Sequence, residues 1–187
     1  RPNGYLGLGY NLTPYLQPDG KNIITVRVDN SLQPAARWYT GSGIYRHVHL
    51  IVTDPIHIAR NGTFVTTSDV SADRATIHIK AEIRNLRGGN PNVTVNSIVV
   101  DDSGKEIGRT EKKPIQLTDN TLFKEDNTAI EDSLTVLQPQ LWGPDTPTTY
   151  QLITEIRQDG QLLDNYATRF GIRRAEFIPE KGMLLNG

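Results

Sequence analysis

Apolar and polar residues alternate along much of this chain, and a period of two is the pattern of a β-strand with one buried face. The run 75–83 shows it best, because every second residue from Ala75 to Ile83 is apolar while those between are polar. The same alternation predicts strands at 22–30, 44–53, 93–100, 133–137, 150–156 and 161–168. The pattern therefore predicts a protein built mainly from strands.

Turn-forming dipeptides stand between these runs. Residue pairs that tolerate positive φ occur at 19–20, 61–62, 88–89 and 159–160. Asp159-Gly160 separates two alternating runs and is the clearest hairpin signal in the chain. No window carries the capped apolar stripe of an amphipathic helix. Short strands separated by turns predict an all-β fold, an immunoglobulin-like β-sandwich.

Three stretches separate along the chain. Residues 1–55 carry predicted strands that end at Asp54-Pro55, whereas residues 56–171 match the size of one immunoglobulin-like sandwich. Residues 172–187 are too few to fold alone. We therefore expect one complete domain, preceded by part of another and followed by a short connection.

Charge and composition exclude several classes of partner. Lys and Arg number 20 against 21 Asp and Glu, so the net charge is -1 and no field that attracts nucleic acid is expected. No apolar run approaches the roughly 18 residues that cross a membrane. Cysteine is absent, which excludes disulfides and thiolate metal sites. The first residues contain neither Met nor the apolar core of a signal peptide, so we expect an internal start and leave the compartment open.

The run Arg37-Trp38-Tyr39-Thr40-Gly41-Ser42-Gly43-Ile44-Tyr45-Arg46 is the most informative motif. It resembles the segment that closes the sugar-binding domain of glycoside hydrolase family 2 enzymes, the group that contains β-galactosidases and β-glucuronidases. Within that group its form is more similar to the galactosidase branch. The resemblance implies that residues 1–55 are the C-terminal part of a jelly-roll sugar-binding domain.

Further segments resemble the same family, in the family's order along the chain. They are Tyr10 to Leu16, where Asn11 replaces the usual Asp, then residues 20–30, Leu141-Trp142-Gly143-Pro144, Phe170-Gly171-Ile172-Arg173, and residues 182–187. The resemblance implies that residues 56–171 are the immunoglobulin-like sandwich domain of such an enzyme. It also implies that residues 172–187 lead into a (β/α)8 catalytic barrel.

The resemblance implies a retaining hydrolase whose two barrel glutamates lie about 5 Å apart. The signature sequences around those glutamates are missing from this chain. We therefore expect no catalytic residue, no cofactor and no metal ligand in residues 1–187, and a β-galactoside-type carbohydrate as the parent enzyme's substrate. The expected partner is the remainder of the same polypeptide, with no nucleic acid and no membrane involved.

Five residues are candidates for roles in the whole enzyme. By the resemblance, Arg37, Trp38 and Tyr39 lie near the barrel mouth, where hydrogen-bond donors and aromatic faces suit a sugar ring. Alternatively, Trp38 packs at a domain interface while Arg37 forms a local ion pair. Arg46 shares a strand face with apolar residues, so we expect a structural ion pair. Trp142 is expected to plug the end of the sandwich, the alternative being a sugar platform.

Two other features carry weaker chemistry. His47 and His49 share a predicted strand face, yet no third ligand accompanies them, so we expect no metal site. Gly41-Ser42-Gly43 is not a nucleophile elbow, since the surrounding five-residue motif and the following helix are absent. A glycine-flanked turn is the better interpretation of this segment.

These observations favour a non-catalytic accessory region of a β-galactosidase-like enzyme. Two other classes remain open, a carbohydrate-binding or adhesion module and a purely structural immunoglobulin-like domain. The apolar face formed by Ile24, Val26 and Val28 predicts self-association of the isolated chain, because such faces pack against other strands. The sequence therefore predicts a homo-oligomer of the isolated chain.

Overall fold

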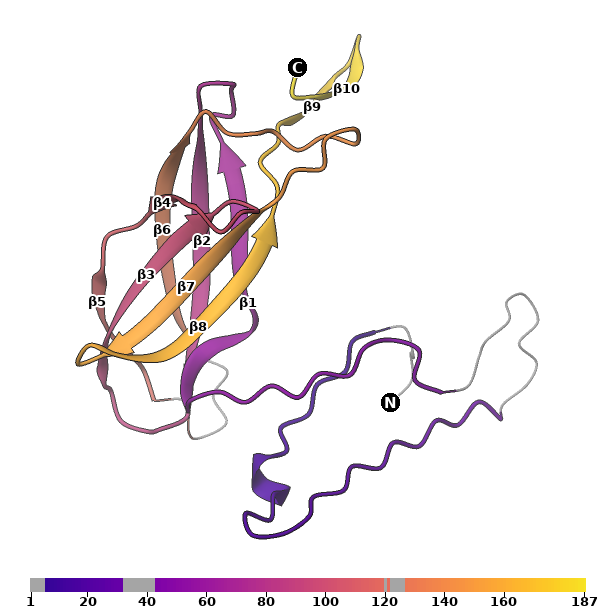
Figure 1. Cartoon of the computed structure of the whole chain (residues 1–187), viewed down its shortest axis with the longest axis vertical. Helices are drawn as coiled ribbons and strands as arrows, with labels where there is room; N and C mark the ends of the chain where they lie inside the picture. Colours follow the sequence, from indigo (N-terminus) through magenta and orange to yellow (C-terminus); the bar gives the residue numbers. More distant parts are fainter. Residues whose placement is uncertain (1–5, 32–42, 120, 122–126) are drawn as a thin grey trace. The chain divides into compact units, whose positions relative to one another are not determined.

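A computed structural model describes residues 6–31, 43–119, 121 and 127–187, and the chain divides into two compact units, Arg1–Leu50 and Ile51–Gly187. In the second unit nearly all regular structure is antiparallel strand, as Figure 1 shows. The fold class predicted from the alternating pattern, all-β with a sandwich, is confirmed. No helix in the described part of the chain is long and apolar enough to cross a bilayer.

Two sheets face each other in the sandwich (Figure 1). The first has the order β1-β2-β6, with bounds Ile56–Ser68, Arg74–Asn85 and Thr128–Leu137. The second has the order β4-β3-β7-β8, with bounds Glu106–Arg109, Asn92–Val100, Tyr150–Gln158 and Gln161–Phe170. Strand β5, Lys113–Gln116, also pairs with β3. A separate hairpin follows, made of β9 and β10, Ala175–Ile178 and Gly182–Leu185.

The core lies between the two sheets, and β2 shows why the sequence folds this way. Its apolar residues from Ala75 to Ile83, at every second position, are all 0–2% exposed, while His78 and Lys80 between them face solvent. They pack in two groups, one with Val99, Leu134, Leu152 and Ile172, the other with Ile56, Val93, Val95 and Ile156. Ile172 follows the last strand of the sandwich and ties the exit segment to the core.

Two predicted turns have different outcomes. Asp159 and Gly160 have φ of 50° and 82° and join β7 to β8, so that hairpin prediction is confirmed. Asn61-Gly62 instead forms a bulge inside β1, where the register with β2 shifts between Ile58 and Thr63. The prediction of a turn at these residues is wrong. An asparagine with φ of 57° followed by a glycine suits a β-bulge as well as a turn. Glycine is needed, since a Cβ at Gly62 would lie 2.7 Å from the Ala59 carbonyl oxygen.

The strands predicted at 22–30 and 44–53 are not formed in the structure. Within its described residues the only regular element is the 3-10 helix η1, Thr13–Tyr15. Ile24, Val26 and Val28 are 66%, 59% and 47% exposed. A strand needs a neighbouring strand to bond its backbone, and none of the described residues pairs with these segments. The assignment of this unit to a jelly roll stays a prediction.

Candidate functional surface at the end of the sandwich

Of the candidate residues in the first unit, the structure describes Arg46 alone. Arg37, Trp38 and Tyr39 lie outside the described residues. Arg46 is described, is exposed, and holds its guanidinium carbon 5.2 Å from the centre of the Tyr45 ring. That geometry is a cation–π contact, while the ion pair expected for Arg46 stays a prediction.

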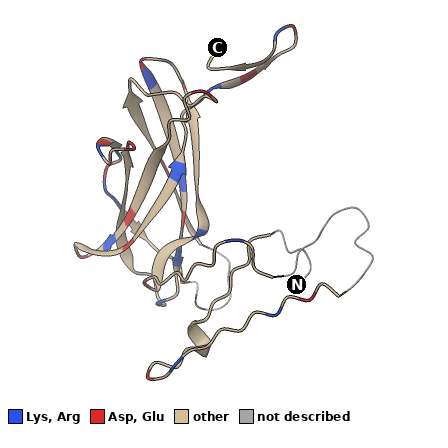
Figure 2. Cartoon of the chain, turned by 45° about the vertical axis from the view of Figure 1, so that its right-hand side comes forward, with Lys and Arg blue, Asp and Glu red and all other residues tan. Residues whose placement is uncertain are grey.

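The histidine pair does not belong to a metal site in the described part of the chain. The rings of His47 and His49 are 5.9 Å apart, but no group of three His, Asp or Glu residues among the described residues could hold a metal ion. Figure 2 shows basic and acidic residues interspersed along the strands and loops. The interspersed signs agree with the near-zero net charge of -1.

Trp142 lies in the loop before β7 and is half-buried. Its backbone N–H donates to the carbonyl of Ile172 at 2.8 Å, and the Arg173 guanidinium carbon lies 4.8 Å from the centre of its ring. A Cβ at Gly171 would lie 3.0 Å from the Trp142 Cβ, so only glycine allows this approach without displacement. The loop and the exit segment of β8 are therefore packed together around this side chain.

Tyr150 fixes the other end of the same loop. Its ring is buried 5.9 Å from that of Phe170, and its hydroxyl accepts the N–H of Gln140 at 2.8 Å and donates to the Gln140 carbonyl at 3.3 Å. Burial raises the pKa of Tyr150, because the charged phenolate would lose its hydration. The hydroxyl therefore stays a neutral donor that anchors the loop at neutral pH.

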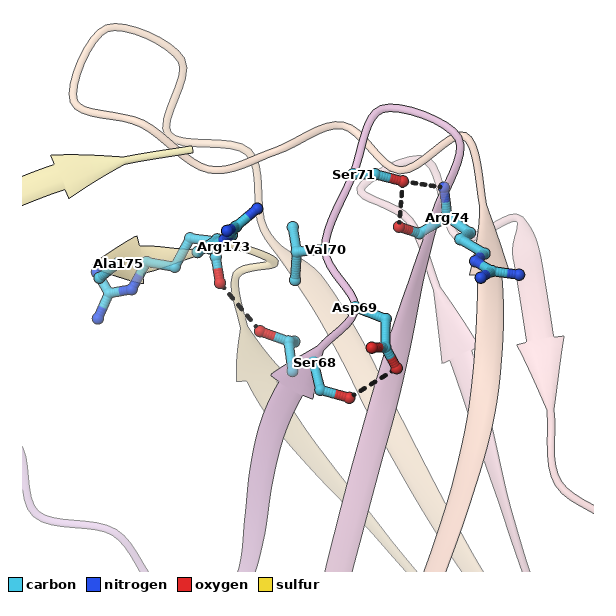
Figure 3. A pocket seen from close by; sticks show the side chains of 9 residues that line it. Ser68, Asp69, Val70, Ser71, Arg74, Arg173 and Ala175 are labelled. Carbon is cyan, nitrogen blue, oxygen red and sulfur yellow. Dashed lines mark hydrogen bonds between the residues drawn. The ribbon is translucent and has the colours of Figure 1, made fainter. Parts of the chain in front are cut away.

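A shallow polar hollow of about 590 Å³ opens beside this exit segment (Figure 3). It is lined by residues 67–71 together with Arg74 and residues 173–175. Thr67 Oγ1 donates to the Arg173 carbonyl at 3.1 Å, and Ser71 Oγ lies 3.2 Å from both the N–H and the carbonyl of Arg74. Two of its arginines are already engaged, Arg173 with Trp142 and Arg174 with Glu176. Thr67 thus ties the end of β1 to the exit segment, while the Ser71 bonds close the loop between β1 and β2.

A serine and a histidine meet near this hollow without forming a catalytic triad. Ser68 Oγ lies 2.8 Å from His78 Nε2 and 3.2 Å from a carboxylate oxygen of Asp69. In a triad the carboxylate orients the histidine through its other ring nitrogen. Here the Asp69 carboxylate contacts the serine, so the arrangement lacks the means to activate a nucleophile.

Three of the described glutamates are poor candidates for acid–base chemistry. Glu155 and Glu176 form ion pairs with Arg157 at 3.2 Å and Arg174 at 2.5 Å, and Glu106 pairs with Arg109. The Arg109 guanidinium lowers the pKa of Glu106. A general acid requires the opposite shift, since it must hold its proton near neutral pH.

Comparisons with known proteins agree on one family. The family model described as "Glycosyl hydrolases family 2" matches residues 56–173. "Beta-galactosidase BoGH2A" of Bacteroides ovatus is 42% identical over 188 residues, which cover 100% of this chain and 21% of that protein. A "Putative beta-glucuronidase" of Formosa agariphila is 33% identical, over 100% of this chain and 17% of that protein.

Solved structures give the same result. A glycosyl hydrolase family 2 member from Bacteroides cellulosilyticus superposes with a TM-score of 0.86 and 36% identity, over 94% of this chain and 23% of that one. A beta-glycosidase from Bacteroides vulgatus matches with a TM-score of 0.78 and 32% identity, over 100% of this chain and 22% of that one. The chain thus spans about a fifth of the length of these relatives. Because the family match covers more than half of the chain, the chain belongs to glycosyl hydrolase family 2.

Proposed function

We propose that this chain is a non-catalytic accessory region of a retaining, β-galactosidase-like glycoside hydrolase. In this proposal residues 1–55 belong to a jelly-roll sugar-binding domain, 56–171 form the immunoglobulin-like sandwich, and 172–187 lead toward a (β/α)8 catalytic barrel. The 42% sequence identity to a protein named a beta-galactosidase supports a β-galactoside as the substrate of the parent enzyme. The ion-paired state of Glu106, Glu155 and Glu176 supports the lack of chemistry in the described part.

The sandwich serves as a rigid spacer in this proposal. Two antiparallel sheets that share one apolar core resist bending, because any bend would disturb close packing. The observation that carries the proposal is the packing of Trp142 against Gly171 and Arg173, which joins the loop before β7 to the chain that leaves β8. A joint of this kind holds the neighbouring domains in register, and a misplacement of about 1 Å can cost roughly 100-fold in rate.

The test uses the full-length enzyme with Trp142→Ala. We expect turnover of a nitrophenyl β-galactoside to fall by about 10- to 100-fold, together with a lower midpoint of thermal unfolding. Trp142→Phe should restore most of the turnover, since it keeps a ring above Gly171. Phe64→Ala is the matched control, because Phe64 is an aromatic residue of β1 that is largely exposed. Turnover and unfolding that both remain unchanged in Trp142→Ala would contradict the positioning role.

Titration of the purified 187-residue chain separates this function from a stand-alone carbohydrate-binding module. The accessory region should neither bind galactosides tightly nor hydrolyse them without the rest of the enzyme. Calorimetry that detects tight binding would favour the module instead. Hydrolysis of the same chromogenic galactoside at enzymatic rates would disprove the lack of catalysis.

The exposed apolar residues of the first unit support a proposal about partners. Ile24, Val26 and Val28 leave a hydrophobic surface that, in the parent enzyme, packs against other strands of the same polypeptide. The isolated chain should therefore form dimers or larger species, and light scattering at increasing concentration measures them. Val26→Ser should reduce this association, and a strictly monomeric chain would contradict the proposal.

A further inference from the structure

Asn186 makes three hydrogen bonds at the end of hairpin β9–β10. Its backbone N–H donates to the Arg174 carbonyl at 2.7 Å, and its side-chain Oδ1 accepts the Arg174 N–H at 2.9 Å. Its Nδ2 donates to the carbonyl of Trp142 at 3.0 Å, across 44 positions of sequence. The first two bonds close the hairpin, whereas the third leaves the hairpin and reaches the sandwich.

The acceptor of that third bond is held by the core. Trp142 donates its N–H to the Ile172 carbonyl at 2.8 Å, and Ile172 is fully buried. Gly171 admits the indole at close range, and Arg173 stacks on it. A continuous series of contacts therefore runs from the sandwich core through Ile172 and Trp142 to the amide of Asn186.

The hairpin needs an external tie, because it buries little of its own surface. Its strands have four residues each, and the cross-strand pair Phe177 and Met183 is 80% and 59% exposed. A two-stranded hairpin of this size is marginally stable in water by itself. Thr67 Oγ1 bonds the Arg173 carbonyl at 3.1 Å, but that contact holds the connection before β9 and leaves the strands free to pivot.

The backbone of Asn186 explains why asparagine suits this position. Its φ is 57°, in the left-handed region that asparagine tolerates better than most residues. The short amide then points one acceptor and one donor to opposite sides. Glycine would keep the backbone conformation but lose both side-chain bonds, and aspartate would keep the acceptor alone.

We propose that Asn186 is a positioning residue whose amide latches hairpin β9–β10 to the sandwich through the Trp142 carbonyl, and so fixes the direction in which the chain leaves the hairpin. The inference rests on the proposed function, because a fixed exit direction matters only where the sandwich sets the position of a neighbouring domain. The latch itself is a property of the described residues and is measured separately.

The test compares three forms of the ¹⁵N-labelled 187-residue chain, the wild type, Asn186→Gly and Asn186→Asp. In the wild type, residual dipolar couplings of residues 175–185 should fit the same alignment tensor as those of β1–β8. In both variants they should fit a separate tensor, and order parameters of the hairpin amides should fall from about 0.85 to below about 0.6. The thermal midpoint of the sandwich should stay unchanged, since the core is untouched.

Asn61→Gly is the matched control. Asn61 has the same φ of 57°, is exposed, and lies in the bulge of β1 away from the hairpin. The control should leave the hairpin aligned with the sandwich. A hairpin that stays aligned and ordered in Asn186→Asp would overturn the latch, because that variant keeps the Arg174 bond and removes only the donor to Trp142.

The same variants in the full-length enzyme separate the two proposals. A released hairpin with reduced kcat and unchanged KM supports both the latch and the positioning role. If the hairpin is released while turnover stays unchanged, the latch stands and the spacer function fails. A hairpin that remains fixed disproves the latch, whatever the turnover.

Discussion

The two units of the chain carry the same alternating pattern and use it differently. In β2 the apolar residues from Ala75 to Ile83 are 0–2% exposed, whereas Ile24, Val26 and Val28 of the first unit are 66%, 59% and 47% exposed. Strand β2 is bonded on both sides, to β1 and to β6, while residues 22–31 have no strand partner among the described residues. Alternation thus predicts which residues share a face, but only a neighbouring strand makes that face a core.

Short-range contacts are alike in the two units. The Asp29 carboxylate accepts the N–H and the hydroxyl of Ser31 at 3.1 and 2.6 Å, and Asp101 accepts those of Ser103 at 2.9 and 2.6 Å. The sandwich also has side-chain contacts between distant segments, such as the bond from the Ile58 N–H to Asp164 across 106 positions. Among its described residues the first unit thus has turn contacts like those of the sandwich, but no paired strands.

The largest difference in stability between the two units should appear when one isoleucine of each is replaced by alanine. Ile77→Ala removes a fully buried side chain from the core between the sheets, so we expect the free energy of unfolding to fall by about 3 kcal/mol. Ile24→Ala should change it by less than about 0.5 kcal/mol, as for other exposed positions. Urea denaturation followed by circular dichroism measures both.

The isoleucine pair also tests the comparison itself. A loss above about 1 kcal/mol at Ile24 would mean that this side chain is buried in solution. The first unit would then contribute its own folded structure, contrary to the exposed face described above.

Substitution of two asparagines, one in each unit, should change the free energy of unfolding by amounts that differ less than those of the isoleucine pair. The two asparagines have the same pattern of hydrogen bonds. Asn85 is fully buried, donates to the carbonyls of Gly89 and Thr118 at 2.9 and 3.2 Å, and accepts the Arg87 N–H at 3.1 Å. Asn22 is exposed, donates to the carbonyls of Gln17 and Gly20 at 3.0 and 3.3 Å, and accepts the Gln17 N–H at 2.9 Å. The geometry is nearly the same, and the access of water is different.

Asn85→Ala should therefore cost about 2 kcal/mol, because it removes three hydrogen bonds made by a fully buried amide. Asn22→Ala should cost less than about 0.5 kcal/mol, since water can replace the lost amide. Urea denaturation again provides the measurement. Equal losses at the two positions would show that burial does not set the difference between the units.

The sandwich could be predicted where the pattern is local. The alternation of 75–83 and the turn at Asp159-Gly160 each depend on adjacent residues, and both match the structure. Strands β4 and β5 were not singled out, because four residues are too few to show a period. The bulge at Asn61-Gly62 was expected as a turn, because the two structures use the same residue types.

The candidate site was predictable only in part. The motif around Trp142 and the sequence Phe170-Gly171-Ile172-Arg173 resemble the family separately, and Trp142 lies 28 positions before Phe170, yet nothing in the sequence indicates that the two segments touch. Asn186 was missed as well, although an Asn-Gly pair directly after a short apolar run is a signal for positive φ. Contacts between distant segments are decided by the packing of both sheets, which no local pattern contains.

The smallest effect concerns the two turn aspartates, and it decides whether the short-range likeness of the units persists in solution. Hydrogen bonds from the neighbouring serine, chiefly from its hydroxyl, lower the pKa of Asp29 and of Asp101 below the usual 3.8. Because the pKa is lower in the folded turn, these bonds stabilise each turn at any pH above the ordinary pKa of Asp. The stabilisation is lost as the pH falls through the lowered pKa. Carbon-13 NMR titration of the carboxylates should show both shifts, and Ser31→Ala and Ser103→Ala should each raise the pKa of the adjacent Asp.

If Asp29 titrates at its usual value while Asp101 stays low, the turns of the first unit are not formed in the isolated chain. The contrast would then lie between a folded sandwich and an unfolded segment, since even contacts across two residues would need a neighbouring strand to hold them.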